Sequence, residues 1–302
     1  MGESKLPLLK VNEVTKKYGE KVAIQHISME LQNNEVLGVV GHNGAGKTTL
    51  FKLILDMYLP DQGEIKFTEK NFHIKNDIGY LPEQRGLYGK TDVFSQLLAF
   101  GYLKGKNKTE LTSTIDFWMD YFNIKENKNE LLANLSKGNQ QKVQFITAVI
   151  HNPKLLILDE PFSGLDPINV DMFMDAIHLM KENGSTIIYS SHKLDSIEHL
   201  SNRLLFLKDG SKVHLDNIEN IQKQYGYKLK IKNDSLTEWL LLELGFEYKV
   251  SNGIFEIGLK DKKDAEYIAS LLTNPFSELY LVEQRSIEEI FKLINREGEL
   301  NA

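Results

Sequence analysis

The sequence of 302 residues contains no cysteine. Disulfides and cysteine-ligated metal sites are therefore excluded, and nothing in the chain calls for an oxidising compartment. Long apolar runs are missing too: Val36–Val40 and Leu155–Leu158 fall far short of the roughly 20 residues that a membrane helix needs. Residues 1–10 contain no apolar stretch of signal-peptide length. We expect a polypeptide that does not cross a bilayer by itself.

Dense positive charge is also missing. The formal net charge is −6, from 36 lysines and arginines against 42 aspartates and glutamates. No block of lysine and arginine is dense enough for a nucleic-acid groove or an anionic lipid surface, so direct binding of DNA or RNA is not expected. The length and the hydrophobic content of 41% leave room for one large domain and a smaller one.

What the sequence does contain is a phosphate-binding pattern, GHNGAGKTT, at residues 41–49. It matches G-x-x-x-x-G-K-[ST], in which backbone N–H groups and a lysine surround the phosphates of a nucleotide. A helix that begins near Lys47 directs its positive end at the same anion. We expect Lys47 to reach the β- and γ-phosphates and Thr48 to bind Mg²⁺. The predicted nucleotide-binding residues of this loop are Gly41, His42, Asn43, Gly44, Ala45, Gly46, Lys47, Thr48 and Thr49.

Two acids follow the apolar run Leu155–Leu158, as expected for a buried strand that ends at a catalytic edge. In open α/β sheets ligands lie beyond the carboxyl ends of the strands, so Asp159 and Glu160 should lie near the phosphates. We expect Asp159 to hold the Mg²⁺ shell and Glu160 to polarise the water that attacks the γ-phosphate. Taken alone, the pair is equally compatible with a solvated acidic turn.

Short apolar runs alternate with amphipathic segments of helix length from about residue 8 to 215, which predicts an α/β domain with a mostly parallel sheet. Val22–Leu31 and Ile65–Phe67 predict an antiparallel flank, and Leu155–Leu158 and Thr186–Tyr189 predict buried central strands. A helical lobe is predicted from the periodicity of Phe94–Lys104, Leu111–Phe122 and Gln140–His151.

The pattern changes after Gly210. Six segments read in order as β, α, β, β, α, β, which is the ferredoxin-like split βαβ arrangement, and a closing helix is predicted at Ile287–Ile294. Asn217–Tyr225 is the most plausible connector. We therefore predict a nucleotide-binding domain at 1–220 and a small α+β domain at 226–302. The six segments are Lys228–Lys232, Leu236–Leu244, Glu247–Val250, Ile254–Ile257, Asp261–Leu272 and Leu279–Val282.

The octet LSKGNQQK at residues 135–142 separates one branch of P-loop enzymes from kinases and GTPases. Together with GHNGAGKTT, LLILDEP and FSGLDP it resembles the signature of ATP-binding-cassette (ABC) ATPases. The resemblance implies a P-loop NTPase of ABC type that binds ATP and Mg²⁺ and works as a head-to-tail pair of copies. It also implies that Ser136 and the backbone N–H of Gly138 act on the γ-phosphate bound by the second copy. Helix capping by Ser136 is the simpler alternative.

The octet departs from the usual LSGGQ at Lys137 and Asn139. This form resembles a subgroup of bacterial export-type ABC subunits, the sodium-efflux-like ones, which tend to carry a small C-terminal domain. GYLPEQ at residues 79–84 resembles the Q-loop of the family, which senses Mg²⁺ and water. The usual glutamine aligns with Glu83, whose carboxylate would coordinate Mg²⁺ directly or through water, and Gln84 follows it. The resemblance leaves both residues as candidates, and an ordinary surface turn is the alternative.

Three more residues match positions of the family. Asp166 resembles the D-loop aspartate, which helps to set the geometry across the paired copies, and it is equally well explained as a helix N-cap with Pro167 at the first helical position. His192 matches the switch histidine that contacts the γ-phosphate. Tyr18 matches the aromatic residue that stacks on adenine. Taken alone, His192 and Tyr18 would each be read as structural.

The resemblance implies the ATP-hydrolysing subunit of an ABC transporter, whose closure moves a separate integral membrane permease. Export is implied by analogy with the subgroup. The implied location is cytoplasmic, peripheral on the inner face of the membrane through the permease, which residues 85–103 are expected to contact. Soluble ABC ATPases with a nucleic-acid, ribosomal or regulatory role are the alternative. Tandem cassettes or a long coiled-coil insertion would favour that alternative, and the chain shows neither.

Overall fold

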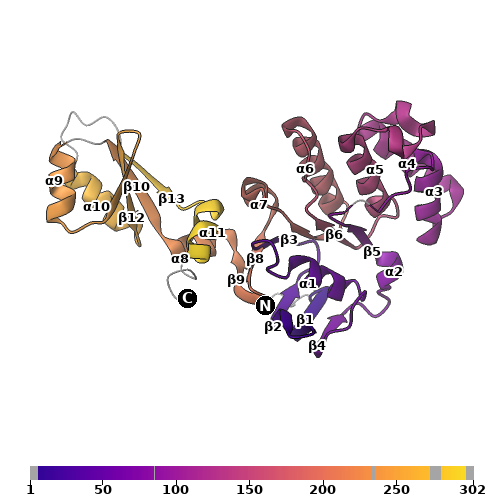
Figure 1. The fold of residues 1–302 in the computed structure, drawn as a ribbon, viewed down its shortest axis with the longest axis horizontal. Coiled ribbons are helices and arrows are strands. Elements are labelled where there is room, and N and C mark those ends of the chain that lie inside the picture. The colour runs from indigo at the N-terminus through magenta and orange to yellow at the C-terminus, as the bar shows by residue number, and fades with distance from the viewer. Residues whose placement is uncertain (1–5, 85, 233–234, 273–279, 297–302) are drawn as a thin grey trace. The chain divides into compact units, whose positions relative to one another are not determined.

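The chain folds into two compact units, Met1–Leu215 and Asp216–Ala302, each with its own hydrophobic core. The predicted domains were 1–220 and 226–302, so the division in the structure falls a few residues earlier. The structure is a computed structural model, and it describes residues 6–84, 86–232, 235–272 and 280–296 (Figure 1).

Parallel strands form the centre of the first unit. In spatial order its six-stranded sheet contains β5 (Ile78–Leu81), β6 (Leu155–Asp159), β7 (Thr186–Ser190), β3 (Val36–Val40), β8 (Arg203–Lys208) and β9 (Ser211–Asn217). Neighbouring strands from β5 to β8 run parallel. Every residue of β3, β6 and β7 is buried, as expected for parallel strands covered on both faces. The predicted central strands are therefore present.

A three-stranded antiparallel sheet forms the flank of this unit, as Val22–Leu31 and Ile65–Phe67 predict. Its order is β2 (Lys21–Leu31), β1 (Leu9–Tyr18) and β4 (Gln62–Phe67). Helix α1 (Lys47–Ile54) joins the two sheets, because its fully buried Phe51 shares one core with Ile24 of β2 and Ile157 of β6. Helix α1, which follows the phosphate loop, thus packs against both sheets.

Helices form a lobe beside the parallel sheet (Figure 1). Side chains cap the first turns of two of them: Asp92 accepts from the N–H of Ser95 at 2.8 Å, and Asn107 accepts from the N–H of Glu110 at 3.0 Å. In the described parts of the chain, no helix is long and apolar enough to span a bilayer. The helices of the first unit after α1 are α2 (Ile74–Asp77), α3 (Val93–Leu103), α4 (Lys108–Tyr121), α5 (Lys137–Val149), α6 (Pro167–Glu182) and α7 (Leu194–Leu200), with 3-10 turns at Lys125–Asn129 and Leu132–Asn134.

The second unit has a four-stranded sheet in the order β11-β12-β10-β13, with antiparallel neighbours. Phe255 and Ile257 of this sheet pack on Leu241 of α9 and Ile268 of α10. The elements follow the β-α-β-β-α-β order of a split βαβ arrangement. Leu279 of the predicted last strand lies outside the described residues. The elements are β10 (Tyr227–Lys232), α9 (Ser235–Glu243), β11 (Tyr248–Ser251), β12 (Ile254–Leu259), α10 (Lys262–Leu272) and β13 (Tyr280–Gln284).

The predicted connector, Asn217–Tyr225, is largely a helix. Helix α8 (Ile218–Tyr225) belongs to the second unit and packs against the closing helix α11 (Ile287–Arg296). Its Ile221 is fully buried, as are Ile287 and Ile290 of α11. Burial of these apolar side chains gives the segment a packing role that its short, polar sequence does not reveal.

Burial of His151 makes the stability of the first unit depend on pH. Burial, reinforced by the charge of Lys104, lowers the pKa of His151 to about 4 from 6.5, and its Nε2 lies 3.1 Å from the carbonyl oxygen of Ile78. The unfolded chain takes up this proton below about pH 6.5, whereas the folded chain does not until about pH 4. The folded state therefore loses stability as the pH falls through this window.

We expect the free energy of unfolding to fall by about 2 kcal/mol between pH 7 and pH 5 from this residue alone. Urea denaturation of the wild type and of His151→Gln at both pH values measures it. The variant should be less stable at pH 7 and should lose less stability on acidification. Equal losses in the two proteins would contradict the assignment.

Candidate functional site

Four parallel strands end at one edge of the sheet, and each leads into residues that line the same cavity. Strand β3 leads to the phosphate loop, β5 to Glu83, β6 to Asp159 and Glu160, and β7 to His192. The register pairs Asp159 with Ser190 of β7, which brings these ends level with one another. The cavity has a volume of about 240 Å³ and is lined by Tyr18, Lys21, Ala23, Asn43, Gly44, Gly46, Lys47, Thr48, Thr49, Glu83, Asp159, Glu160 and His192.

The phosphate loop takes a conformation that requires glycine at two positions. Gly44 has φ of +84° and Gly46 has φ of +107°, in the left-handed region that other residues rarely adopt. A Cβ on Gly46 would also lie 2.6 Å from the carbonyl oxygen of Ala23. Around Gly44 there is open space, so the loop presents its backbone to the cavity there.

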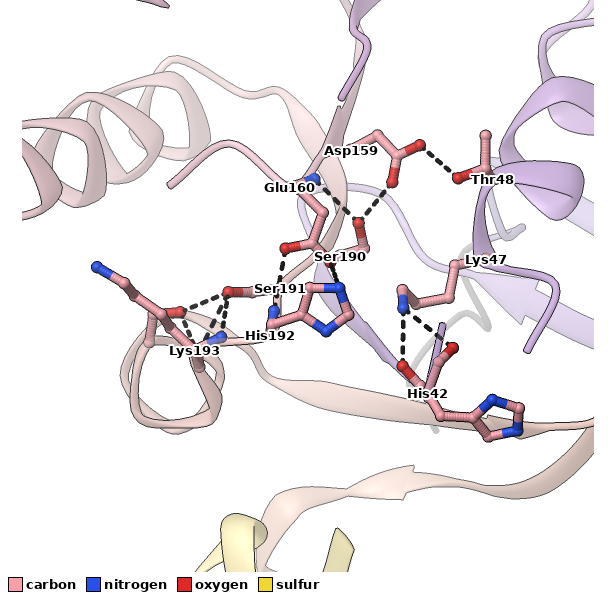
Figure 2. Close-up of polar contacts among 11 residues, drawn as sticks. His42, Lys47, Thr48, Asp159, Glu160, Ser190, Ser191, His192 and Lys193 are labelled. Atoms are coloured by element: carbon pink, nitrogen blue, oxygen red, sulfur yellow. Dashed lines mark hydrogen bonds and ion pairs between the residues drawn. The ribbon is translucent and has the colours of Figure 1, made fainter. Parts of the chain in front are cut away.

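Lys47 begins helix α1 and is almost fully buried. Its Nζ donates to the carbonyl oxygen of Gly41 at 2.7 Å and lies 3.5 Å from that of His42 (Figure 2). Burial lowers the pKa of the amine, and the negative charges of Glu160, Asp159 and Glu83 oppose this lowering. A buried cation held by carbonyl oxygens beside open backbone is suited to an anionic ligand.

Asp159 is held between two hydroxyl groups, as Figure 2 shows. The Oγ1 of Thr48 donates to its Oδ2 at 2.7 Å, and the Oγ of Ser190 donates to its Oδ1 at 2.7 Å. The carboxylate is almost fully buried. These contacts fix the carboxylate of Asp159 beside the hydroxyl of Thr48 at the start of α1.

Glu160 has a left-handed backbone conformation, and one of its two carboxylate oxygens has no hydrogen-bond partner among the described residues. Its φ is +52°, and its N–H donates to the Oγ of Ser190 at 3.0 Å. Its Oε2 accepts from the N–H of His192 at 3.0 Å, and its Oε1 lies 3.3 Å from the ring Nε2 of His192. Among the described residues Oε1 is buried and makes no hydrogen bond. Burial raises the pKa of this carboxyl against the opposing effects of His192 and Lys47.

The site suits a divalent cation bound together with phosphate. Mg²⁺ usually takes one or two carboxylates and completes its shell with waters and phosphate oxygens. Asp159 supplies a carboxylate, with the hydroxyl of Thr48 2.7 Å from it, and the carboxylate of Glu83 lines the same cavity. The described residues contain no cluster of three or more acidic or histidine ligands, so waters and phosphate oxygens would have to complete the shell of a metal here.

Some of the remaining predicted residues line the cavity, and others do not. Tyr18 lies at the cavity wall, with its ring centroid 5.9 Å from that of Tyr58. Glu83 lines the cavity, whereas Gln84 does not and is instead near Gln144, whose Nε2 lies 3.5 Å from its carbonyl oxygen. Gly41, His42 and Ala45 do not line the cavity. Their backbone groups instead hold the phosphate loop: the carbonyl oxygens of Gly41 and His42 contact Lys47, and the N–H of Ala45 donates to the carbonyl oxygen of His42.

Ser136, Gly138 and Asp166 do not line this cavity. Ser136 is exposed and caps helix α5, accepting from the N–H of Asn139 at 3.2 Å. Asp166 caps helix α6, accepting from the N–H of Asn169 at 2.9 Å, with Pro167 at the first helical position. Ser136 and Asp166 are thus the N-caps of α5 and α6, the alternative role predicted for each from the sequence.

Sequence reasoning missed Ser190 as a member of the site. It is a polar residue at the end of an apolar strand, the same position that Asp159 has in β6, and that similarity is the signal that would have found it. Lys21 and Ala23 of β2 also line the cavity, and no pattern in the sequence points to them.

Known proteins resemble this chain over most of its length. A family model described as ABC transporter matches residues 24–163. An uncharacterized ABC transporter ATP-binding protein of Bacillus subtilis is 37% identical over 289 residues, which cover 94% of this chain and 97% of that protein. Another, of Methanocaldococcus jannaschii, is 44% identical over 230 residues, which cover 76% of this chain and 85% of that protein.

Among solved structures, that of an ATP-binding subunit of an ABC transporter has a TM-score of 0.68 and 25% sequence identity, and it covers 79% of this chain and 99% of its own length. The predicted P-loop fold of ABC type, with its mixed sheets and helices, is thereby confirmed. By similarity along nearly all of its length, the chain belongs to the ATP-binding subunits of ABC transporters, proteins that bind ATP and hydrolyse it.

Proposed function

We propose that this subunit powers export through a separate membrane permease, acting as a head-to-tail pair of copies that encloses two ATP molecules. One observation supports the pairing above all. The cavity gathers Lys47, Asp159 and Glu160, whereas Ser136 stands exposed at the start of α5, outside the cavity. Each chain thus offers one half of a site, and the second copy supplies the other half.

The reaction is phosphoryl transfer from ATP to water, in which positioning and charge neutralisation dominate. Lys47 binds the β- and γ-phosphates, and Tyr18 stacks on the adenine. Thr48 and Asp159, with Glu83, would hold Mg²⁺, which would supply neutralisation of phosphate charge. Ser136 and Gly138 of the second copy close the site over the γ-phosphate, and Asp166 sets the geometry between the copies.

Glu160 is the proposed general base. Its buried Oε1 makes no hydrogen bond within the described residues and contacts only the ring Nε2 of His192 among the ion pairs there, so we assign it as the acceptor of the proton from the attacking water. Its raised pKa makes it a better proton acceptor than an exposed carboxylate. His192, 3.3 Å away, donates toward the γ-phosphate and limits where the carboxylate can turn.

Export rather than import is proposed from the LSKGNQQK form of the signature, which resembles export-type subunits. The permease contact is proposed for the segment between Gly86 and Leu103, since Tyr88 and Leu103 expose more than half of their side chains there. Arg85, the predicted first residue of this segment, lies outside the described residues. The subunit would then act on the cytoplasmic face of the membrane, held by its permease.

The pairing and the role of Glu160 are tested together by Glu160→Gln. We expect turnover to fall by about 10²- to 10⁴-fold, because the amide cannot accept the proton, while ATP binding is retained. Sizing chromatography with ATP and Mg²⁺ should then show a trapped dimer. Glu182→Gln, at the exposed end of α6, is the matched control and should behave as the wild type. Retained turnover in Glu160→Gln would remove this residue from the base role.

The permease contact is tested by Tyr88→Asp and Leu87→Asp. Each should leave basal ATPase activity largely unchanged and reduce transport by the reconstituted complex, since an introduced charge disrupts an apolar contact. Leu59→Asp, at an equally exposed position outside the segment, controls for the effect of a surface charge. Parallel loss of ATPase and transport in the two segment variants would count against the contact.

A further inference from the structure

Two buried glutamines on helix α5 face the catalytic edge of the sheet. Gln141 and Gln144 are each almost fully buried, and their spacing of three residues places them on the same side of the helix. Neither belongs to the cavity wall. Both use their side-chain amide groups to bind backbone carbonyl oxygens next to residues that do line it.

Gln144 holds the chain on both sides of Glu83. Its Nε2 donates to the carbonyl oxygen of Pro82 at 3.0 Å and lies 3.5 Å from that of Gln84. Its Oε1, however, is buried and makes no hydrogen bond within the described residues. An unpaired buried acceptor is unfavourable, so an apolar side chain would suit the packing better. We attribute the amide at this position to the two carbonyl contacts.

Gln141 makes the equivalent contact one helical turn earlier. Its Nε2 donates to the carbonyl oxygen of Pro161 at 3.3 Å. Pro161 directly follows Glu160, whose left-handed φ of +52° has to be stabilised by the surrounding contacts. The contact therefore fixes the chain on the far side of the strained residue, while Ser190 holds its N–H.

We propose that Gln144 and Gln141 are positioning residues that set the places of Glu83 and Glu160 in the cavity. This proposal rests on the proposed roles of those two carboxylates. It links elements far apart in the sequence: Glu83 follows β5, Glu160 follows β6, and both are held by one face of α5. Because α5 begins directly after Ser136, a displacement of this helix would move both carboxylates together.

The test uses Gln144→Met and Gln141→Met, which keep the length of the side chain and remove its donor. Gln222→Met is the matched control, since the Nε2 of Gln222 likewise donates to a backbone carbonyl oxygen, that of Arg285 at 3.2 Å, but in the second unit. For each protein we would measure the Mn²⁺ dissociation constant in the presence of a non-hydrolysable ATP analogue, by electron paramagnetic resonance, together with kcat and KM for ATP and the melting temperature.

Gln144→Met should weaken Mn²⁺ binding by about 10-fold, because a lost buried donor releases the chain around Glu83. Gln141→Met should lower kcat by about 10-fold with KM and Mn²⁺ affinity unchanged, because only Glu160 loses its support. Gln222→Met should change neither the Mn²⁺ affinity nor kcat. If both test variants match Gln222→Met, or if all three differ from the wild type only in melting temperature, the proposal is overturned.

Gln144→Glu supplies the rescue. Burial would keep its carboxyl protonated at low pH, and the O–H would then donate to Pro82. We expect the Mn²⁺ affinity of this variant, relative to the wild type at the same pH, to rise as the pH is lowered, opposite to the trend of a site that binds metal through carboxylates. A relative affinity that stays flat or falls as the pH is lowered would overturn the donor role of this side chain. The outcome for Glu160→Gln, by contrast, bears on the base and leaves this measurement unaffected.

Discussion

The catalytic edge depends on the parallel register of strands β5, β6, β7 and β3. This register pairs Leu81 with Leu158 and Asp159 with Ser190, so the residues that follow each strand meet at one level. A slip by a single residue would turn the side chains of that strand to the opposite face. The correct register of strands such as β6 is therefore required by the site as well as by the core.

Burial then decides how the charges at this edge behave. One lysine, Lys47, lies among three carboxylates: burial lowers the pKa of its amine, and the negative charges of the carboxylates oppose this lowering. For Glu160 the effects are reversed: burial raises the pKa of its carboxyl, and the charges of His192 and Lys47 oppose this rise. The two groups thus stabilise each other's charged state. Asp159 differs from Glu160 in having both oxygens bonded to hydroxyl groups, which ties it to Thr48 of α1 and to Ser190 of β7.

Much of this arrangement could be predicted from the sequence, for physical reasons. Buried parallel strands leave continuous apolar runs, and the spacing of the glycines and the lysine in residues 41–49 is specific to a phosphate-binding loop. The sequence therefore predicts Lys47, Asp159 and Glu160 at one edge of the sheet, and in the structure they line one cavity. The choice between Glu83 and Gln84 could not be made, because both residues lie in a bend after β5, and the direction of each side chain there depends on tertiary contacts such as those of Gln144. Ser190 was missed because its role depends on the register between two strands. The helix at Ile218–Tyr225 was missed because its stabilisation comes from packing on α11.

The left-handed backbone of Glu160 has a consequence for the stability of the protein. A residue with a side chain is strained at φ of +52°, and glycine would relieve that strain. Glycine would also remove the carboxylate. In the role of general base proposed for Glu160, selection for a more stable fold and selection for ATP turnover would act in opposite directions at this one position, and its glutamate would mark a compromise in favour of activity.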